Sequence, residues 1–381
     1  MLIAFWFFAV LIFYTLIGFP VAIFLLSRIF SKPVRRDSDG SGELPTVSLI
    51  VAAYNEEKVI EARIENALSL NYPRDKLEVL VVSDGSTDQT PLRVEAFAGR
   101  GVRSLYNPVR RGKTAALNRT VPASNGEILL FADANTTYNT DAVLNMIRNF
   151  TDPAVGAVSG RKLIVKEEGR FASEGETSYW QYESFVKSCE SQIGSIATAD
   201  GEIFAIRRSL FSPLPEDIIH DDMALTLDVI QKGYRVVYEP AAVSSELASK
   251  NAQDEYQIKI RLAAGGYQIL YRFHALFFPP RNLFAVMFLS HKFLRWAMPL
   301  WLIGLFLSNL FLPQTYYRVT LWGQVLFYAV GTAGVFFHKQ KGGRKIFYFP
   351  NYFCMANLAA FVGLIRFATG TQGAAWRKAE R

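Results

Sequence analysis

Apolar residues are concentrated at the two ends of this chain of 381 residues, and that distribution limits the folds available to it. Residues 2–30 are almost uninterruptedly apolar, which is enough to cross the roughly 30 Å hydrocarbon layer of a bilayer. A signal peptide fits less well, because the run exceeds the apolar core of such a peptide and no basic region precedes it. Three basic residues follow within 31–36, so the positive-inside rule predicts that the chain continues in the cytosol. We therefore expect a protein of the cell (inner) membrane whose main domain is cytosolic.

The other end of the chain contains three further apolar segments, at residues 295–312, 319–337 and 346–367. Each is long enough to be a membrane-spanning helix, which predicts a multi-pass protein. Three spans after the central domain would place the C-terminus outside the cell, whereas the basic end at Trp376–Arg381 is typical of a cytosolic segment. Either the last apolar segment is re-entrant, or one of the predicted segments does not span.

Residues 256–278 mix basic and apolar side chains, which is typical of a helix lying in the membrane interface. The alternative is an amphipathic helix that packs against the soluble domain. The predicted order is a transmembrane helix at 1–30, a linker at 31–44, a cytosolic domain at 45–252, interfacial helices at 253–290, transmembrane helices at 291–370 and a basic tail at 371–381.

The net charge of +7 fits this arrangement, because much of the basic surplus borders the apolar ends. Membrane lipids are therefore expected partners. A nucleic acid is not, since no basic stripe with exposed aromatic residues occurs outside the membrane flanks. The two cysteines, Cys189 and Cys354, are far apart and form neither a metal-binding nor a disulfide pattern.

Between the apolar ends, the sequence is typical of a soluble α/β domain. Runs that favour strands at 47–53, 77–83, 102–106 and 127–132 alternate with segments of helical spacing such as 58–70. This alternation predicts a mostly parallel sheet. Ligands of such sheets bind beyond the carboxyl ends of the strands, and polar clusters follow three of these runs.

Two of the predicted strands are followed directly by aspartates, Asp84 and Asp133. Asp133 and Asn135 are two positions apart, so they point the same way from an extended strand end and could face one metal-bound ligand. Each residue alone is a weak signal, because an aspartate at a strand end is more often a turn or cap residue. The prediction depends on their combination, in order, with other motifs.

Six motifs in the region 45–268 resemble those of the family-2 glycosyltransferases, in the cellulose-synthase-like group. They are Ala53-Tyr-Asn-Glu56, Ser83-Asp-Gly-Ser-Thr-Asp88, Arg111-Gly-Lys-Thr-Ala-Ala-Leu-Asn118, Asp133-Ala-Asn135, Ala199-Asp-Gly-Glu202 with Arg207-Arg208, and His220-Asp-Asp222. The resemblance implies a GT-A-type nucleotide-sugar-binding domain with transmembrane and interfacial helices. It also implies a membrane-bound inverting enzyme that transfers a sugar from a UDP-sugar to a polysaccharide or glycan acceptor.

The family implies roles for individual positions. The residues expected to bind the donor are Tyr54, Glu56, Asp84, Lys113, Asp133 and Arg261. Asp133 and Asn135 would hold Mg²⁺ or Mn²⁺, and the neutral oxygen of Asn135 predicts a weakened metal dependence, since Mg²⁺ tolerates neutral ligands and keeps waters. Asp222 is the expected catalytic base, with Asp221 beside it. The residues expected on the acceptor side are Asp200 and Gly201, with Arg207 and Arg208 closing their loop, and Trp180 as a stacking platform.

One departure from the family pattern bears on the product. Polymerising members carry a Gln-x-x-Arg-Trp motif on the interfacial helix, where this chain has Ile258 and Leu262 at the Gln and Trp positions and keeps Arg261. An arginine can still make a two-pronged phosphate contact. The missing tryptophan leaves polymer synthesis and the transfer of one sugar to a lipid-linked acceptor as open alternatives. A catalytically weak or inactive subunit is a third, because the second acidic residue of the metal motif is Asn135.

Overall fold

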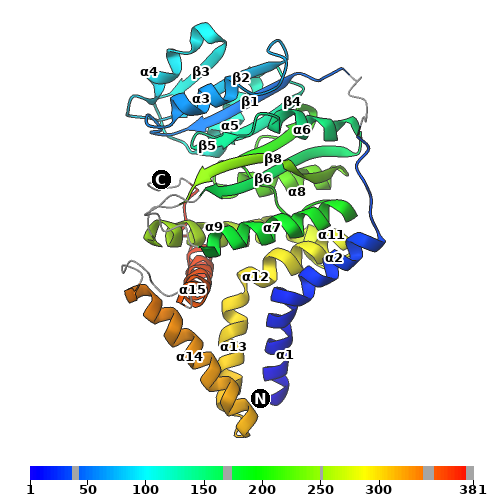
Figure 1. The fold of residues 1–381 in the computed structure, drawn as a ribbon, viewed down its shortest axis with the longest axis vertical. Helices are drawn as coiled ribbons and strands as arrows, with labels where there is room; N and C mark the ends of the chain where they lie inside the picture. Colours follow the sequence, from blue (N-terminus) through cyan, green and yellow to red (C-terminus); the bar gives the residue numbers. More distant parts are fainter. Residues whose placement is uncertain (37–42, 166–173, 249–251, 338–346, 375–381) are drawn as a thin grey trace.

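The computed structural model describes residues 1–36, 43–165, 174–248, 252–337 and 347–374. Part of the predicted linker, residues 37–42, and most of the predicted basic tail, residues 375–381, lie outside the described residues. Figure 1 shows three levels: a sheet covered by helices, a layer of helices beneath it, and helices that project away from the sheet.

The central element is an eight-stranded sheet of order β3-β2-β1-β4-β7-β6-β8-β5. Its strands are β1 (Val47–Ala53), β2 (Leu77–Asp84), β3 (Val102–Asn107), β4 (Ile128–Asp133), β5 (Thr136–Tyr138), β6 (Val155–Val165), β7 (Ile203–Arg207) and β8 (Arg235–Leu247). The pairs β1·β2, β1·β4, β2·β3 and β6·β8 are parallel, whereas β7 and β5 run against their neighbours. The predicted mostly parallel α/β sheet is confirmed, and the four predicted strands correspond to β1 to β4.

Apolar cores lie on both faces of this sheet. Neighbouring residues of β1 point to opposite faces, so Leu49 belongs to one core and Ile50 to the other. The first core includes residues of α3 (Ile60–Leu68), α4 (Thr90–Glu95) and α6 (Ala142–Ile147). The second includes residues of α5 (Lys113–Thr120) and α8 (Asp221–Gln231). Helices on both faces explain why the strands read as nearly continuous apolar runs.

A layer of helices separates the sheet from the projecting helices (Figure 1). It contains α7 (Glu174–Ile193), α9 (Ala252–Arg272), α10 (His274–Phe277), α11 (Leu283–Phe288), a π-helical turn (Leu289–Phe293) and α12 (Leu294–Trp296). The predicted interfacial helix at 256–278 is realised as α9 and α10. One face of α9 packs closely on the domain, since a Cβ atom at Gly265 would lie 2.3 Å from His220 Cδ2. The contacts therefore agree with the alternative of a helix packed on the domain, and its position in a membrane interface stays a prediction.

The projecting helices are α1 (Leu2–Phe13), a π-helical turn (Tyr14–Gly18), α2 (Phe19–Ile29), α13 (Met298–Leu310), α14 (Thr315–Phe337) and α15 (Tyr348–Ala368). In the described residues, Leu2–Ile29 and Phe349–Ala368 are long and apolar enough to cross a membrane. They support membrane association and agree with two predicted spans. The predicted span at 319–337 lies within α14, which, in the part of the chain that the structure describes, is not among the helices apolar enough to cross a membrane.

The predicted span at 295–312 is not one straight helix. Leu283–Trp296 and Met298–Leu310 meet at an angle of 63°, so they form a third span only if the bent pair is counted as one. Pro299 stands in the first turn of α13, where a proline is tolerated, but it donates no backbone hydrogen bond to the preceding turn. The bend therefore falls where the hydrogen-bond ladder of the helix is interrupted.

Candidate active site

Loops at the carboxyl ends of β1, β2 and β4 form one pocket. Because β1 pairs with both β2 and β4, Ala53 lies beside Ser83 and Ala52 beside Asp133. The pocket is lined by the predicted residues Tyr54, Glu56, Asp84, Lys113, Asp133 and Asn135. The structure thus brings together side chains from positions 54 to 135 of the sequence.

Asp84 organises one wall of this pocket from a buried position. Its carboxylate accepts hydrogen bonds from the backbone N–H groups of Arg111 (3.0 Å) and Gly112 (2.6 Å), and from the Arg119 guanidinium (2.8 Å). Gly85 has a φ of 70°, and a Cβ there would lie 2.6 Å from Arg110 Cβ. Only glycine permits this approach, so Asp84 and Gly85 together fix the loop that leads into α5.

Two arginines of this wall were missed by the sequence analysis. The guanidinium carbon of Arg110 lies 3.7 Å from the centre of the Tyr54 ring, so the predicted nucleoside-binding tyrosine is stacked on a cation. Arg119 pairs with Asp84 from α5. Both lie in or beside the recognised basic motif, but no local pattern indicates which aromatic ring or carboxylate they contact.

Lys113 connects this pocket with the acidic pair Asp221 and Asp222. Its Nζ donates to Asp133 Oδ1 at 2.6 Å and to the Gly201 carbonyl at 3.2 Å, and lies 3.9 Å from Asp221 Oδ2. Burial disfavours the charged form, but the Asp133 and Asp221 carboxylates outweigh it and raise the pKa of Lys113. A permanently charged ammonium group therefore stands between the strand end and the acidic pair.

Asp221 and Asp222 begin α8, as expected for an acidic pair at a helix N-terminus. The Gly201 N–H donates to Asp222 Oδ2 at 3.0 Å, and the Met223 N–H donates to Oδ1 at 2.7 Å. Burial opposes ionisation, yet the nearby His220 ring, 3.8 Å away, and the Lys113 ammonium group hold the pKa of Asp222 down, at about 2. Burial and the neighbouring Asp222 carboxylate raise the pKa of Asp221. The two neighbours thus differ in basicity.

Helix α9 holds the loop that precedes this pair. Arg261 Nη2 donates to the Ile219 carbonyl at 3.1 Å, and a His220 ring nitrogen, Nε2, lies 2.8 Å from the Leu262 carbonyl oxygen. The predicted Arg261 is therefore beside the acidic pair. Leu262, at the position of the family's tryptophan, contributes its backbone to this contact.

Gly265→Ala is expected to impair both folding and turnover, because the new methyl group would displace the His220 ring that lies beside Asp222. Overpacking of this kind costs about 1–3 kcal/mol of unfolding free energy. Thermal unfolding and transfer rate measured on the same preparation check this expectation. Gly99→Ala is the control, since nothing lies within 4 Å of a Cβ placed there; equal behaviour of the two variants would contradict the packing argument.

Of the residues predicted on the acceptor side, Gly201 lies beside the acidic pair, whereas Asp200 and Trp180 contact lysine side chains. Gly201 lies between Asp222 and Lys113, but the Asp200 carboxylate is engaged by Lys187 Nζ at 2.6 Å. The Trp180 ring lies 5.1 Å from Lys162 Nζ, which is paired with Glu202 (2.5 Å) and Glu246 (2.6 Å). Glu246 also accepts a hydrogen bond from Asn135 Nδ2 at 3.3 Å. Glu202 and Glu246 were not proposed as site residues from the sequence, although Glu202 ends one of the recognised motifs.

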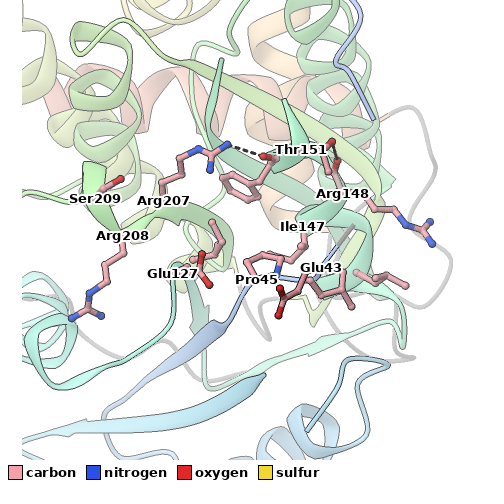
Figure 2. Close-up of a pocket in the computed structure, with 13 residues that line it drawn as sticks. Glu43, Pro45, Glu127, Ile147, Arg148, Thr151, Arg207, Arg208 and Ser209 are labelled. Atoms are coloured by element: carbon pink, nitrogen blue, oxygen red, sulfur yellow. Dashed lines mark hydrogen bonds between the residues drawn. The ribbon is translucent and has the colours of Figure 1, made fainter. Parts of the chain in front are cut away.

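Arg207 and Arg208 were expected beside the acceptor loop, and this was wrong. Strand β7 starts at Ile203 near Gly201 and runs away from it, so five residues carry the chain about 15 Å toward the other end of the sheet. There both arginines line a pocket of about 910 Å³ (Figure 2). Arg207 Nη2 donates to the Phe150 carbonyl at 2.7 Å. None of the residues predicted to bind the donor or the acceptor, or to act as the base, lines this larger pocket.

Glu202 should make stability depend on pH near neutrality. Burial and the Glu246 carboxylate outweigh Lys162 and raise the pKa of Glu202 from 4.5 to about 7. Because the folded state holds this proton more tightly than the unfolded state, the contribution to stability is complete below about pH 4.5 and is lost as the pH rises through about 7. Thermal unfolding at pH 5.5 and pH 8 should show this loss in the wild type and a smaller one in Glu202→Gln; equal losses would contradict it.

Asp133 and Asn135 fit a cation that the ligand helps to hold. The Asp133 carboxylate is one-quarter exposed and lies in the pocket, where one carboxylate and one amide oxygen are available. Among the described residues, no group of three or more histidine, cysteine or acidic side chains could hold a metal alone. Mg²⁺ is commonly bound by one or two protein oxygens together with phosphates and water, so the two residues suit a metal–diphosphate rather than an isolated ion.

The architecture defines the class of domain. The structure is similar to that of a mannosyltransferase from Pyrobaculum calidifontis, solved in complex with GDP-Man and Mn²⁺, with a TM-score of 0.72. The superposed region covers 96% of this chain and 99% of the mannosyltransferase. The two chains are 23% identical, so the likeness concerns the fold. It confirms the expected GT-A-type fold.

The sequence comparisons find similarity between this domain and a known enzyme family. Residues 48–214 of the chain match the model of Glycosyl transferase family 2. This match supports the predicted resemblance to family-2 glycosyltransferases, while the cellulose-synthase-like group stays a prediction.

Three curated relatives are similar to about three-fifths of the chain or slightly more. The probable glycosyltransferase YdaM of Bacillus subtilis is 30% identical over 263 residues, 65% of this chain and 62% of that protein. A beta-monoglucosyldiacylglycerol synthase of Nostoc is 29% identical, over 65% of this chain and 54% of that protein. A poly-beta-1,6-N-acetyl-D-glucosamine synthase of Staphylococcus aureus is 28% identical, over 60% and 57%. The aligned parts therefore span between 54% and 62% of these relatives.

Proposed function

We propose that this chain is a membrane-bound inverting glycosyltransferase that transfers a sugar from a UDP-sugar to a polysaccharide, glycan or lipid-linked acceptor at the cytosolic membrane face. The main support is Lys113, whose ammonium group links Asp133 of the pocket with Gly201 and Asp221 beside Asp222. The proposal takes this ammonium group as a fixed positive charge and the Asp222 carboxylate as the base of the same site.

The residues suggest a division of labour. Tyr54, Glu56 and Asp84 would hold the nucleoside, and Lys113 and Arg261 would neutralise the diphosphate. Asp222 is ionised at neutral pH and would take the proton of the acceptor hydroxyl as its oxygen attacks the anomeric carbon and the nucleoside diphosphate leaves. Asp133 and Asn135 would hold Mg²⁺ or Mn²⁺, which supplies further positive charge to the leaving diphosphate.

The proposal includes two kinds of acceptor, a growing polysaccharide and a lipid-linked acceptor. The relatives named above include a glycolipid synthase and a polysaccharide synthase. Leu262 in place of the tryptophan associated with polymer synthesis favours single transfer, whereas the arrangement of α9 beside the acidic pair agrees with either product. Product length separates them.

The test is a donor panel with the purified full chain in detergent or lipid nanodiscs. UDP-glucose, UDP-galactose, UDP-N-acetylglucosamine and GDP-Man would be supplied with Mg²⁺ or Mn²⁺, with and without chelator, and with Asp222→Asn as a matched control. Released nucleoside diphosphate and product length are measured. We expect turnover with a UDP-sugar that chelation reduces.

Each other outcome has a defined meaning. Turnover with GDP-Man alone would overturn the choice of UDP and keep transfer. Short, lipid-extractable product supports single transfer, and long product supports polymer synthesis. An absence of turnover with every donor, in a preparation whose folding is verified, would favour a non-catalytic subunit.

A further inference from the structure

Helix α7 carries three buried charged residues on one face, at positions 183, 187 and 190. Residues three and four apart are neighbours on a helix surface, so Glu183, Lys187 and Glu190 form a continuous charged row. The helix lies between the sheet and the bent helix pair α11–α13 (Figure 1). A buried charge is costly unless it is paired, so each member of this row should have a defined partner.

The two glutamates of the row contact the segment at the bend. Glu183 pairs with Lys292 at 2.8 Å and with Arg295 at 2.5 Å. The Glu190 carboxylate lies 2.8 Å from the ring nitrogen Nδ1 of His291. It also accepts a hydrogen bond from the Ala197 N–H at 2.9 Å. Both ends of the row are therefore anchored, and α7 cannot rotate without breaking buried ion pairs.

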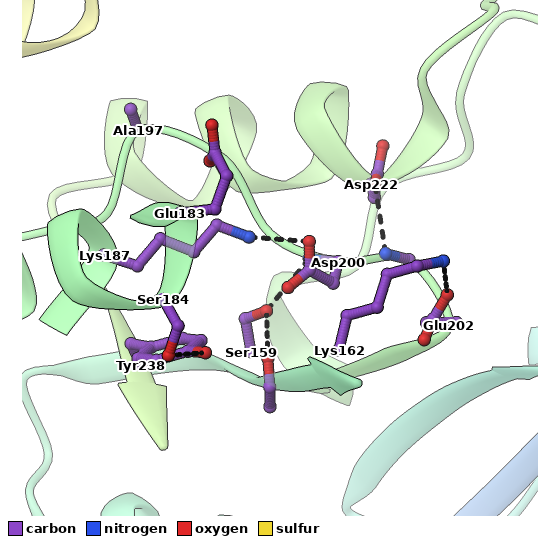
Figure 3. Close-up of polar contacts among 12 residues, drawn as sticks. Ser159, Lys162, Glu183, Ser184, Lys187, Ala197, Asp200, Glu202, Asp222 and Tyr238 are labelled. Carbon is purple, nitrogen blue, oxygen red and sulfur yellow. Dashed lines mark hydrogen bonds and ion pairs between the residues drawn. The ribbon is translucent and has the colours of Figure 1, made fainter. Parts of the chain in front are cut away.

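The central residue, Lys187, contacts the predicted acceptor loop instead (Figure 3). Its side chain is 2% exposed, and its Nζ lies 2.6 Å from Asp200 Oδ1. Burial disfavours the ammonium form, but the Asp200 and Glu183 carboxylates outweigh it and raise the pKa of Lys187. The Asp200 N–H donates to Ser159 Oγ at 2.9 Å, which anchors the loop at a second point.

The residue that follows Asp200 lies at the centre of the site. The Gly201 N–H donates to Asp222 Oδ2, and the Gly201 carbonyl accepts from Lys113 Nζ. A Cβ placed on Gly201 would lie 3.0 Å from Asp222 Cβ, so the loop and the acidic pair are in close contact. A shift of the Asp200 side chain would therefore move a hydrogen bond of the proposed base.

We propose that Lys187 is a positioning residue that holds Asp200 so that the Gly201 amide meets the Asp222 carboxylate. Through Glu183 and Glu190, the same helix ties this loop to the bent helix pair. The proposal rests on the proposed function for its effect on turnover, but its effect on the loop can be measured without activity. In this proposal Asp200 anchors the loop, and does not contact the acceptor as the sequence analysis predicted.

The experiment compares Lys187→Met, Lys187→Arg and the double variant Lys187→Met/Asp200→Asn in the full chain. Lys187→Met leaves a buried carboxylate unpaired and could destabilise the whole protein, so the double variant, which removes both charges, keeps the test informative. Lys232→Met is the matched control, because Lys232 pairs with Asp228 on α8 at a partly exposed position. Hydrogen exchange of the loop 197–204, thermal unfolding, and the separate rates of transfer and of donor hydrolysis are measured.

We expect faster exchange of the loop amides in Lys187→Met and in the double variant, and wild-type exchange in Lys232→Met. Transfer should fall up to about 100-fold, the size expected for a displacement of about 1 Å at a reacting centre, while donor KM stays near the wild-type value. The double variant should regain thermal stability without regaining transfer, and Lys187→Arg should keep most of both.

Two results would overturn the proposal. The first is unchanged loop exchange in a folded Lys187→Met or double variant. The second is full recovery of transfer in the double variant. That result would show that Lys187 and Asp200 only neutralise each other's charge and do not position the loop. If the wild type is inactive with every donor, the proposed function fails, while the exchange result still decides whether Lys187 holds the loop.

Discussion

Asp222→Asn should lower the rate of sugar transfer by about 10²–10⁴-fold, the range attributed to a positioned general base, and leave donor binding near the wild-type level. The amide is the same size as the carboxylate, and its oxygen can still accept the Gly201 N–H now made to Asp222 Oδ2. The loop contact can therefore survive while the proton acceptor is lost. Steady-state transfer kinetics and equilibrium donor binding, measured on the same preparation, check this expectation.

Asp221→Asn is the comparison that decides between the two neighbours. Asp222 is held in the ionised form by His220 and by backbone N–H groups, whereas burial and Asp222 raise the pKa of Asp221. A higher pKa makes a stronger base, so electrostatics alone leaves Asp221 as a candidate. A larger rate loss in Asp221→Asn than in Asp222→Asn would assign the base to Asp221, and wild-type rates in Asp222→Asn would remove Asp222.

Lys113→Met is expected to lower kcat/KM by about 10²–10³-fold, comparable to the loss of one fixed donor that stabilises developing negative charge. The ammonium group now neutralises Asp133 and Asp221, and its removal leaves their carboxylates facing the diphosphate. Donor affinity should fall together with turnover, which distinguishes this variant from Asp222→Asn. Donor titration and initial rates provide the measurement.

Two further variants make the result on Lys113 specific. Lys113→Arg keeps the charge but replaces a compact ammonium with a planar group, so it should restore donor affinity more fully than turnover. Lys76→Met removes a lysine that pairs with exposed Glu43 away from the site and should behave as the wild type. Wild-type donor affinity in Lys113→Met would show that this ammonium group does not contact the diphosphate.

Local patterns were sufficient for the first half of the sheet. The runs at 47–53 and 127–132 are strands within one residue of their predicted bounds, because an apolar strand between helices has a short, self-contained signature. The second half was not predicted. Strands β6, β7 and β8 are assembled by pairing between distant segments, and β7 is reversed between two parallel neighbours. That reversal moved Arg207 and Arg208 away from the acceptor loop.

The partners of buried charges were equally hidden. Lys187 and Asp200 each looked ordinary, one within a polar helix and the other within a recognised motif, and only the packing of α7 on the sheet brings them to 2.6 Å. The same holds for Arg110 on Tyr54 and for Glu202 beside Lys162. The sequence shows which side chains can carry a charge. Which residue each of them pairs with depends on which helices and strands become neighbours in the fold.

The sequence by itself determined the apolar ends, the parallel α/β order of the central domain and the set of residues at the strand ends, since these follow from local periodicity and motif order. Only the tertiary structure decided that Lys113 joins Asp133 to the acidic pair, that the segment after Trp296 is bent, and that Asp200 is held by α7. These features arise from contacts between segments far apart in the chain, and burial makes each of them costly to leave unpaired.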